Sequence, residues 1–340
     1  LCGICHDVSN PVFVRVKDAD YAPGGFDEKH PDMKLSNMFP IERTYSEWSA
    51  SEYAAKGVKA PQFAGNKPGG VVSTCQDCHM RDVNAAGAEG VRPRADLALH
   101  DLTGGNTFSP ATIQAAFPTE VDMDQMNAAA GRAEEMLKKA ATLELAPRPS
   151  GVSVKVINHT GHKLPSGYPE GRRIWINLKA MDASGKVVFE SCRYDFDTAL
   201  LTVDEQARVY EVTPGFSPGL ARALGMPAGK SFHFVLNDTI YSDNRIPPRG
   251  FTNAGFIEAQ SPPVGHSYED GQYWDTADYS LPPGCVSVTA TLYYQTASRE
   301  YIEFLRSENR TNDEGEKLFR SWSENGMSTP VVMATAQIPL

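Results

Sequence analysis

The sequence changes character at Val152-Ser153-Val154-Lys155-Val156, where apolar and polar residues alternate. Such alternation is typical of strands with one buried face. The same period recurs downstream, and turns rich in Pro and Gly, such as Pro282-Pro283-Gly284, separate the runs. We therefore predict a mainly antiparallel β-sandwich. Its expected strands include the alternating sets at 174–178, 232–236 and 286–294 and a last strand at 331–337, and two helices, at 299–305 and 314–324, interrupt the pattern.

The residues before this region predict a different architecture, with many loops and few regular elements. One helix is expected from Tyr45 to Lys56, ended by Gly57, and a second from about Glu120 to Thr142, with Asp122 or Asp124 at its N-terminus. The fold class is therefore α+β. We expect a loop-rich and helical domain over residues 1–142 and the β-sandwich over residues 143–340.

Two short motifs carry the chemistry of the first domain. Residues 2–6 read Cys-Gly-Ile-Cys-His and residues 75–79 read Cys-Gln-Asp-Cys-His. Both match C-x-x-C-H, the attachment pattern of c-type haem. Two thiols one helical turn apart add to the two vinyl groups of one haem, and the adjacent imidazole binds its iron. We predict two covalent haem c groups, held by Cys2, Cys5, Cys75 and Cys78, with His6 and His79 as iron ligands.

A zinc site and a thioredoxin-like redox pair are the alternatives for a C-x-x-C sequence. Either would tolerate any residue after the second cysteine. The 340 residues include only eight histidines, yet one follows each pair, which favours haem.

Composition excludes other classes of function. The formal net charge of −10 argues against a nucleic-acid partner, since phosphate binding needs clustered Lys and Arg. No apolar run reaches the roughly 18 to 20 residues of a membrane helix, so we expect no membrane span. Because covalent haem is attached outside the bacterial cytoplasm, we expect a periplasmic or extracellular protein. The chain begins at Leu1 without an export signal, so we expect it to derive from something longer.

Two cysteines lie outside the motifs. Cys192 ends a strand-like run and Cys285 opens another. Exported proteins can form disulfides, so these residues are either a bridge between two strands or two buried thiols, and the sequence leaves both open.

Six further histidines are candidates for the second axial position on each iron. His100 precedes a Gly-Gly pair that would let the backbone approach a porphyrin, and His162 lies in a turn made rigid by prolines and glycines. His30 is a third candidate, and His159 and His266 remain alternatives. His233 alternates with Phe232 and Phe234 and is expected to lie on a strand face. Two imidazoles per iron predict low-potential haems.

Several stretches resemble secreted bacterial multihaem c-type cytochromes, and in particular their C-terminal part. These stretches are Cys2–Pro11, Phe39–Tyr53, Cys75–Met80, His100–Asn106, Gly161–Arg173, Asp243–Phe251 and Leu292–Leu305. The resemblance implies that His162 and His100 are distal ligands. It also implies electron transfer with other redox proteins or copies of the chain as partners, in some relatives as filaments. Such cytochromes usually carry more than the two haems expected here.

The leading hypothesis is therefore an electron carrier rather than an enzyme. The alternative is a multihaem oxidoreductase in which one iron keeps an open position for a small nitrogen or sulfur compound. A third class is a surface-attachment module whose β-sandwich binds a partner or a carbohydrate.

Overall fold

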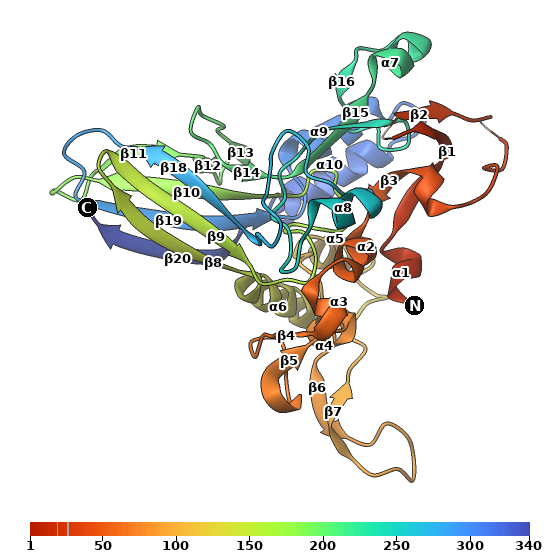
Figure 1. Cartoon of the computed structure of the whole chain (residues 1–340), viewed down its shortest axis with the longest axis horizontal. Coiled ribbons are helices and arrows are strands. Elements are labelled where there is room, and N and C mark those ends of the chain that lie inside the picture. The colour runs from red at the N-terminus through yellow and green to blue at the C-terminus, as the bar shows by residue number, and fades with distance from the viewer. Residues whose placement is uncertain (19, 26) are drawn as a thin grey trace.

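A computed structural model of the chain describes residues 1–18, 20–25 and 27–340. Helices make up 25% and strands 32% of the structure, and the strand pairs are antiparallel, so the α+β fold class is confirmed. In Figure 1 the long strands gather at the end of the molecule that holds the C-terminus, and the short elements of the first hundred residues lie toward the N-terminus.

Two antiparallel sheets form the strand-rich part. The larger has the order β11-β10-β19-β20, with β14 also paired to β10, and the smaller has the order β18-β9-β8. Their strands are β10 (Arg173–Met181), β11 (Val187–Ser191), β14 (Val209–Tyr210), β19 (Ser287–Gln295) and β20 (Val331–Pro339), and then β8 (Ala141–Arg148), β9 (Gly151–Asn158) and β18 (Trp274–Ser280).

The two sheets enclose one apolar core. Val152, Val154 and Val156 of β9 are fully buried, and they belong to the same cluster as Leu178 of β10 and Leu292 of β19. The alternation that predicted these strands thus records which side chains face the core. Burial of each such side chain stabilises the fold by roughly 1.5–3 kcal/mol.

Apart from α6, the first 140 residues form mostly short elements, and these include the strands β1 to β7, which the sequence did not predict. They are α1 (Cys2–Cys5), β1 (Val8–Lys17), β2 (Asp20–Pro23), η1 (Leu35–Asn37), β3 (Met38–Glu42), α2 (Thr44–Ser49), α3 (Glu52–Lys56), β4 (Val58–Lys59), η2 (Pro68–Gly70), β5 (Val71–Val72), α4 (Cys75–His79), β6 (Asp82–Ala85), β7 (Arg94–Ala98), α5 (Ser109–Ala116) and α6 (Met123–Ala140).

The helix predicted from Tyr45 to Lys56 is two helices. Ser51 interrupts it, because its hydroxyl accepts a hydrogen bond from Tyr53 N and caps a new helix, α3. Gly57, with φ of 75°, ends α3 as predicted. Asp122 caps α6 through Gln125 N. Helix α6 then passes directly into β8 at Ala141, and it packs against β20.

Smaller elements connect the long strands. They are β12 (Tyr194–Asp195), β13 (Leu200–Leu201), β15 (Val212–Phe216), α7 (Pro218–Leu224), β16 (Gly229–Lys230), β17 (Thr239–Asp243), α8 (Asn253–Glu258), α9 (Arg299–Glu308) and α10 (Glu314–Glu324). The helices at 299 and 314 and the last strand lie where the sequence places them.

The predicted strand over Phe232–Leu236 is wrong. This segment is a turn in which His233 O accepts hydrogen bonds from Leu236 N and Asn237 N. Phe232 packs on Tyr301, whereas Phe234 packs on Tyr168. The alternating aromatic residues therefore pack on different parts of the fold, because they belong to a turn and do not share one face of a sheet.

Cys192 and Cys285 are two free thiols, not a disulfide. Cys192 is buried in the cluster around Trp175, and burial raises the pKa of its thiol to about 12. Cys285 is partly buried and donates to Pro282 O at 3.2 Å.

In the described part of the chain, no helix combines the length and the apolar character needed to cross a membrane.

Candidate haem site

Both C-x-x-C-H motifs open on one cavity of about 290 Å³. Cys2 and His6 line it from the first motif, and Cys75, Cys78 and His79 line it from the second. Its walls also include residues of α6, of β19 and of the loop that follows β9, so the cavity lies where the short N-terminal elements meet the two sheets. No group of three or more His, Cys, Asp or Glu side chains suited to holding a metal ion occurs among the described residues.

The second motif is a single, tightly capped helical turn. Thr74 and Asp77 form a capping box at the start of α4, and Asp77 Oδ2 also accepts from Lys67 Nζ and Ser73 N, both at 2.7 Å. Burial raises the pKa of Asp77, but these hydrogen bonds outweigh burial and hold it below its ordinary value. Residues three and four apart share one helix face, so this turn presents Cys75, Cys78 and His79 together.

His79 and His162 lie opposite each other across the cavity. Their ring centres are 6.3 Å apart and their ring planes are 20° from parallel. His79 Nδ1 is 2.5 Å from Thr103 O, and His162 Nδ1 is 2.9 Å from Lys163 O. Each Nδ1 thus has a carbonyl partner, which assigns the proton to Nδ1. The lone pair of Nε2 is then free to bind a metal. Burial lowers the pKa of both imidazoles, which favours the same neutral form.

This pair fits an iron held between two imidazoles. Two metal–nitrogen bonds of about 2 Å and two nitrogen-to-ring-centre distances of about 1 Å add up to about 6 Å. The carbonyl partners of both Nδ1 atoms match the hydrogen bonds that orient metal-binding histidines.

The cavity walls suit a flat apolar group with acidic edges. Trp48, Phe63 and Leu137 supply apolar surface, and Arg172 supplies a cation. The Arg172 guanidinium donates to Ser166 O at 2.6 Å, while its Nε is buried without a partner among the described residues. An unpaired buried donor of this kind fits the carboxylate of a haem propionate.

The two motifs lie close together although they are far apart in the sequence. Cys2 and Cys75 line the same cavity, and burial, followed by the influence of Cys2, raises the pKa of Cys75. The charge of His6 also lowers the pKa of His79, after burial and against the hydrogen bond to Thr103. Groups attached at the two motifs would therefore be close neighbours.

The first motif lies nearer the surface. His6 Nδ1 is 3.0 Å from Glu42 Oε1, and the His6 side chain is 58% exposed. A carboxylate on Nδ1 is a further arrangement that leaves Nε2 available for metal. Among the described residues, the histidines that line the cavity are His6, His79 and His162, and no fourth imidazole among them faces His6 there.

The structure does not bring the other two predicted ligands to this cavity. His30 is buried in its own loop, where Nδ1 accepts from Met33 N and Nε2 is 3.4 Å from Asn37 O. His100 is exposed. Its loop nevertheless serves the site, because Thr103 O contacts His79 and Leu102, Gly104 and Gly105 line the cavity.

The remaining histidines contact other side chains. His159 Nε2 is 3.0 Å from Thr142 Oγ1, and His266 is 3.4 Å from Asp275. The His233 ring stacks on Phe216.

A buried charge network holds the loop that carries His162. Glu47 of α2 is fully buried and accepts from Lys163 N at 3.0 Å, Ser166 Oγ at 2.9 Å and Ser261 Oγ at 2.8 Å. The fully buried Lys163 donates from Nζ to Asp243 Oδ2 at 2.7 Å.

Arg245 completes this network. It pairs with both oxygens of Asp243, at 2.9 and 2.6 Å, and lies 3.4 Å from Glu47. Burial raises the pKa of both carboxyl groups, but Arg245 and Lys163 outweigh it and keep both values below the ordinary range. Two anions and two cations therefore balance next to His162.

Sequence reasoning did not single out Glu47, Lys163, Asp243 or Arg245. The signal was present, because these residues lie in three of the stretches that resemble multihaem cytochromes. Those stretches, far apart in the chain, meet in this network.

Comparison with known proteins adds little to this geometry. Neither the models of known protein families nor the curated proteins contain a match to the sequence. Among solved structures, a penta-heme cytochrome c552 from Thermochromatium tepidum matches with a TM-score of 0.46 and 18% identity, over 89% of this chain and 52% of that one. The chain thus spans about half the length of that protein, and a TM-score of this size does not establish a shared fold.

Proposed function

We propose that this chain is an electron carrier that binds two haem c groups, one at each C-x-x-C-H motif, outside the bacterial cytoplasm. The observation that carries the proposal is the His79–His162 pair, with its 6.3 Å ring separation over the cysteines of the second motif. When bound, haem supplies a one-electron Fe(III)/Fe(II) couple. His79 and His162 would both hold that iron, which would leave it no place to bind a substrate.

The rest of the site supports transfer rather than catalysis. Apolar side chains line the cavity beside both imidazoles, and the balanced network holds the His162 loop through Lys163. Because Cys2 and Cys75 line one cavity, a haem at each motif would lie near the other, so that an electron has a short path through the chain. Because the first motif is exposed, electrons would pass from its haem to another redox protein or to another copy of the chain. A filament is one form that an assembly of such copies would take.

One observation favours an oxidoreductase as the second candidate. The exposed His6 has no opposing imidazole in the cavity, so the iron of the first motif would keep an open position unless a ligand came from elsewhere.

Spectra of the ferric and ferrous protein separate these two functions. We expect low-spin spectra, unchanged by cyanide, nitrite or carbon monoxide, for the haem at Cys75–His79. If both haems bind these ligands in the wild-type chain, the carrier proposal fails. If only the haem at Cys2–His6 binds them, the oxidoreductase is favoured.

Loss of attachment is the most direct test of the cofactor. Intact mass under denaturing conditions should show two haems in the wild type, and one haem in each of the double variants Cys2→Ala/Cys5→Ala and Cys75→Ala/Cys78→Ala. The double variant Cys192→Ala/Cys285→Ala is the matched control and should retain two. A wild-type mass without added porphyrin would refute covalent attachment.

Arg172→Leu should lower the midpoint potential of the haem at Cys75–His79. The guanidinium lines the cavity, and removal of a cation stabilises the more positive ferric state, by an amount on the order of tens of millivolts. Spectroelectrochemical titration measures the shift. Arg310→Leu, at a side chain that is 78% exposed, is the control, and an equal shift in both variants would contradict a specific role for Arg172.

A further inference from the structure

The histidines of the two C-x-x-C-H motifs face different hydrogen-bond acceptors. His79 Nδ1 lies 2.5 Å from a neutral carbonyl, Thr103 O. His6 Nδ1 instead lies 3.0 Å from a carboxylate oxygen, Glu42 Oε1. A partner on the second nitrogen orients a metal-binding histidine and changes its basicity. The two expected haems would therefore differ, although the motifs that hold them are alike.

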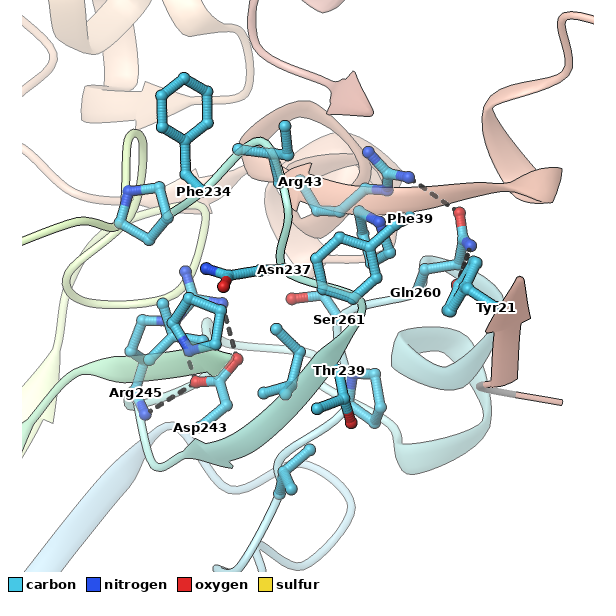
Figure 2. Close-up of a pocket in the computed structure, with 18 of the residues that line it drawn as sticks. Tyr21, Phe39, Arg43, Phe234, Asn237, Thr239, Asp243, Arg245, Gln260 and Ser261 are labelled. Carbon is cyan, nitrogen blue, oxygen red and sulfur yellow. Dashed lines mark hydrogen bonds and ion pairs between the residues drawn. The ribbon is translucent and has the colours of Figure 1, made fainter. Parts of the chain in front are cut away.

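The Glu42 carboxylate is nearly enclosed by the protein. Among the described residues, its side chain is 11% exposed and pairs with His6 rather than with a Lys or an Arg. The arginines around it donate to other acceptors, and these pairs are Arg43 with Gln260 Oε1 at 2.9 Å, Arg172 with Ser166 O at 2.6 Å and Arg245 with Asp243 Oδ2 at 2.6 Å. Figure 2 shows the first and third of these pairs beside a separate cavity of about 430 Å³. Because an enclosed anion without a cation is costly, Glu42 favours positive charge at His6.

The fold holds Glu42 in place through Thr44. Glu42 ends β3, and Thr44 begins α2. The Thr44 hydroxyl donates to Glu42 Oε1 at 3.1 Å and accepts from Gly167 N at 3.0 Å. Gly167 belongs to the loop that also carries His162. The same loop thus holds the Glu42 carboxylate in place against His6.

The charge of Glu42 favours the ferric state of an iron bound to His6. Ferric iron carries one more positive charge than ferrous iron, and a nearby anion attracts the more positive state more strongly. The Nδ1–H of His6 transmits this effect, because a hydrogen bond to a carboxylate is charge-assisted and stronger than one to a carbonyl. Thr103 O carries no such charge, so the same lowering of the potential is not expected at His79.

We propose that Glu42 is a positioning residue that orients His6 and lowers the midpoint potential of the haem at Cys2–His6. This inference rests on the proposed function, because it concerns the haem expected at the first motif. It adds an electronic difference between the two haems that the motifs alone do not contain.

Three substitutions of Glu42 separate its charge from its shape. Glu42→Gln keeps the length of the side chain and removes the charge, whereas Glu42→Asp keeps the charge and shortens the side chain. The measurement is spectroelectrochemical titration of the full haem-loaded chain, in which we expect two one-electron steps. In Glu42→Gln the reduction equilibrium constant of one step should rise at least tenfold, which is about 59 mV for one electron. In Glu42→Asp the same step should move by less than about threefold. If Glu42→Gln does not fold, Glu42→Asp and Glu42→Asn make the same comparison at the shorter length, with the tenfold difference expected between them.

Glu52→Gln is the matched control. Glu52 lies in the same part of the chain, pairs with Lys56 at 3.5 Å, is 27% exposed and does not line the haem cavity. Neither step should move by more than about threefold in this variant. The double variant Cys75→Ala/Cys78→Ala retains the haem at Cys2–His6 and assigns the step, because the tenfold rise caused by Glu42→Gln should recur in it.

Intact mass under denaturing conditions separates this inference from the proposed function. A wild-type chain without haem would refute the proposed function itself. With two haems attached, three outcomes would overturn the role of Glu42. They are a Glu42→Gln variant in which neither step moves or both move equally, a Glu42→Asp variant that shifts as much as Glu42→Gln, and a control Glu52→Gln that shifts as much as either.

Discussion

Replacement of His162 by alanine should convert the haem at Cys75–His79 from a low-spin form to a high-spin form that binds carbon monoxide. Of the two haems expected per chain, this one should change completely, because among the described residues His162 is the histidine that faces His79, at 6.3 Å. The Nδ1 of His79 would still hold its bond to Thr103 O, so the proximal side should persist. Visible and electron paramagnetic resonance spectra measure the change.

Two further variants of His162 make this result specific. His162→Gly should regain a low-spin spectrum when free imidazole is added, since the cavity then has room for it. His162→Met should remain six-coordinate with a higher potential, because a thioether stabilises the ferric state less than an imidazole does.

The controls are His30→Ala and His100→Ala. Neither residue lines the cavity, so both variants should leave this haem low-spin. A high-spin signal in His100→Ala together with none in His162→Ala would reverse the assignment of the distal ligand.

Glu47→Gln should lower the free energy of unfolding by about 3–5 kcal/mol, the usual cost of leaving a buried charge unpaired. The substitution keeps the shape of the side chain but removes one of two anions that balance Lys163 and Arg245. It also replaces an acceptor of Lys163 N by a group that is half donor. Denaturant unfolding followed by far-ultraviolet circular dichroism and by the Soret band measures the loss.

Glu314→Gln is the matched control for this prediction. Glu314 pairs with Lys317 at 2.8 Å, but its side chain is 64% exposed, so the same substitution should cost less than about 1 kcal/mol. If Glu47→Gln and Glu314→Gln cost the same, the network does not stabilise the His162 loop in the way described.

The sequence predicted best those features that local chemistry determines. A C-x-x-C-H motif places its residues within one helical turn, so the sequence alone predicted that Cys75, Cys78 and His79 lie together. In strands such as β9, apolar residues alternate with polar ones, and this pattern predicted which side chains are buried. Local pattern failed at Phe232–Leu236, where alternate residues contact different parts of the fold. It also missed the short helices α5, α7 and α8, whose length gives too few turns for a periodic signal.

Tertiary contacts account for what the sequence left open. His162 was selected for its rigid turn, but only the fold brings it opposite His79, 83 positions earlier in the numbering. From the sequence alone, Glu47 cannot be told from an ordinary exposed acidic residue on a helix. Its neighbours in the chain do not indicate that Lys163 and Arg245 are its partners. The boundary predicted at residue 142 remains a prediction, since α6 continues directly into β8.

The position of His162, beyond that junction, has a consequence for how the protein matures. A chain emerges from synthesis and export N-terminus first, so both attachment motifs become available before the loop that carries His162. An iron bound to His79 would therefore stay open on one side until the later strands assemble around Lys163. During biogenesis, the appearance of the low-spin state would then report completion of the second half of the molecule rather than attachment of the cofactor.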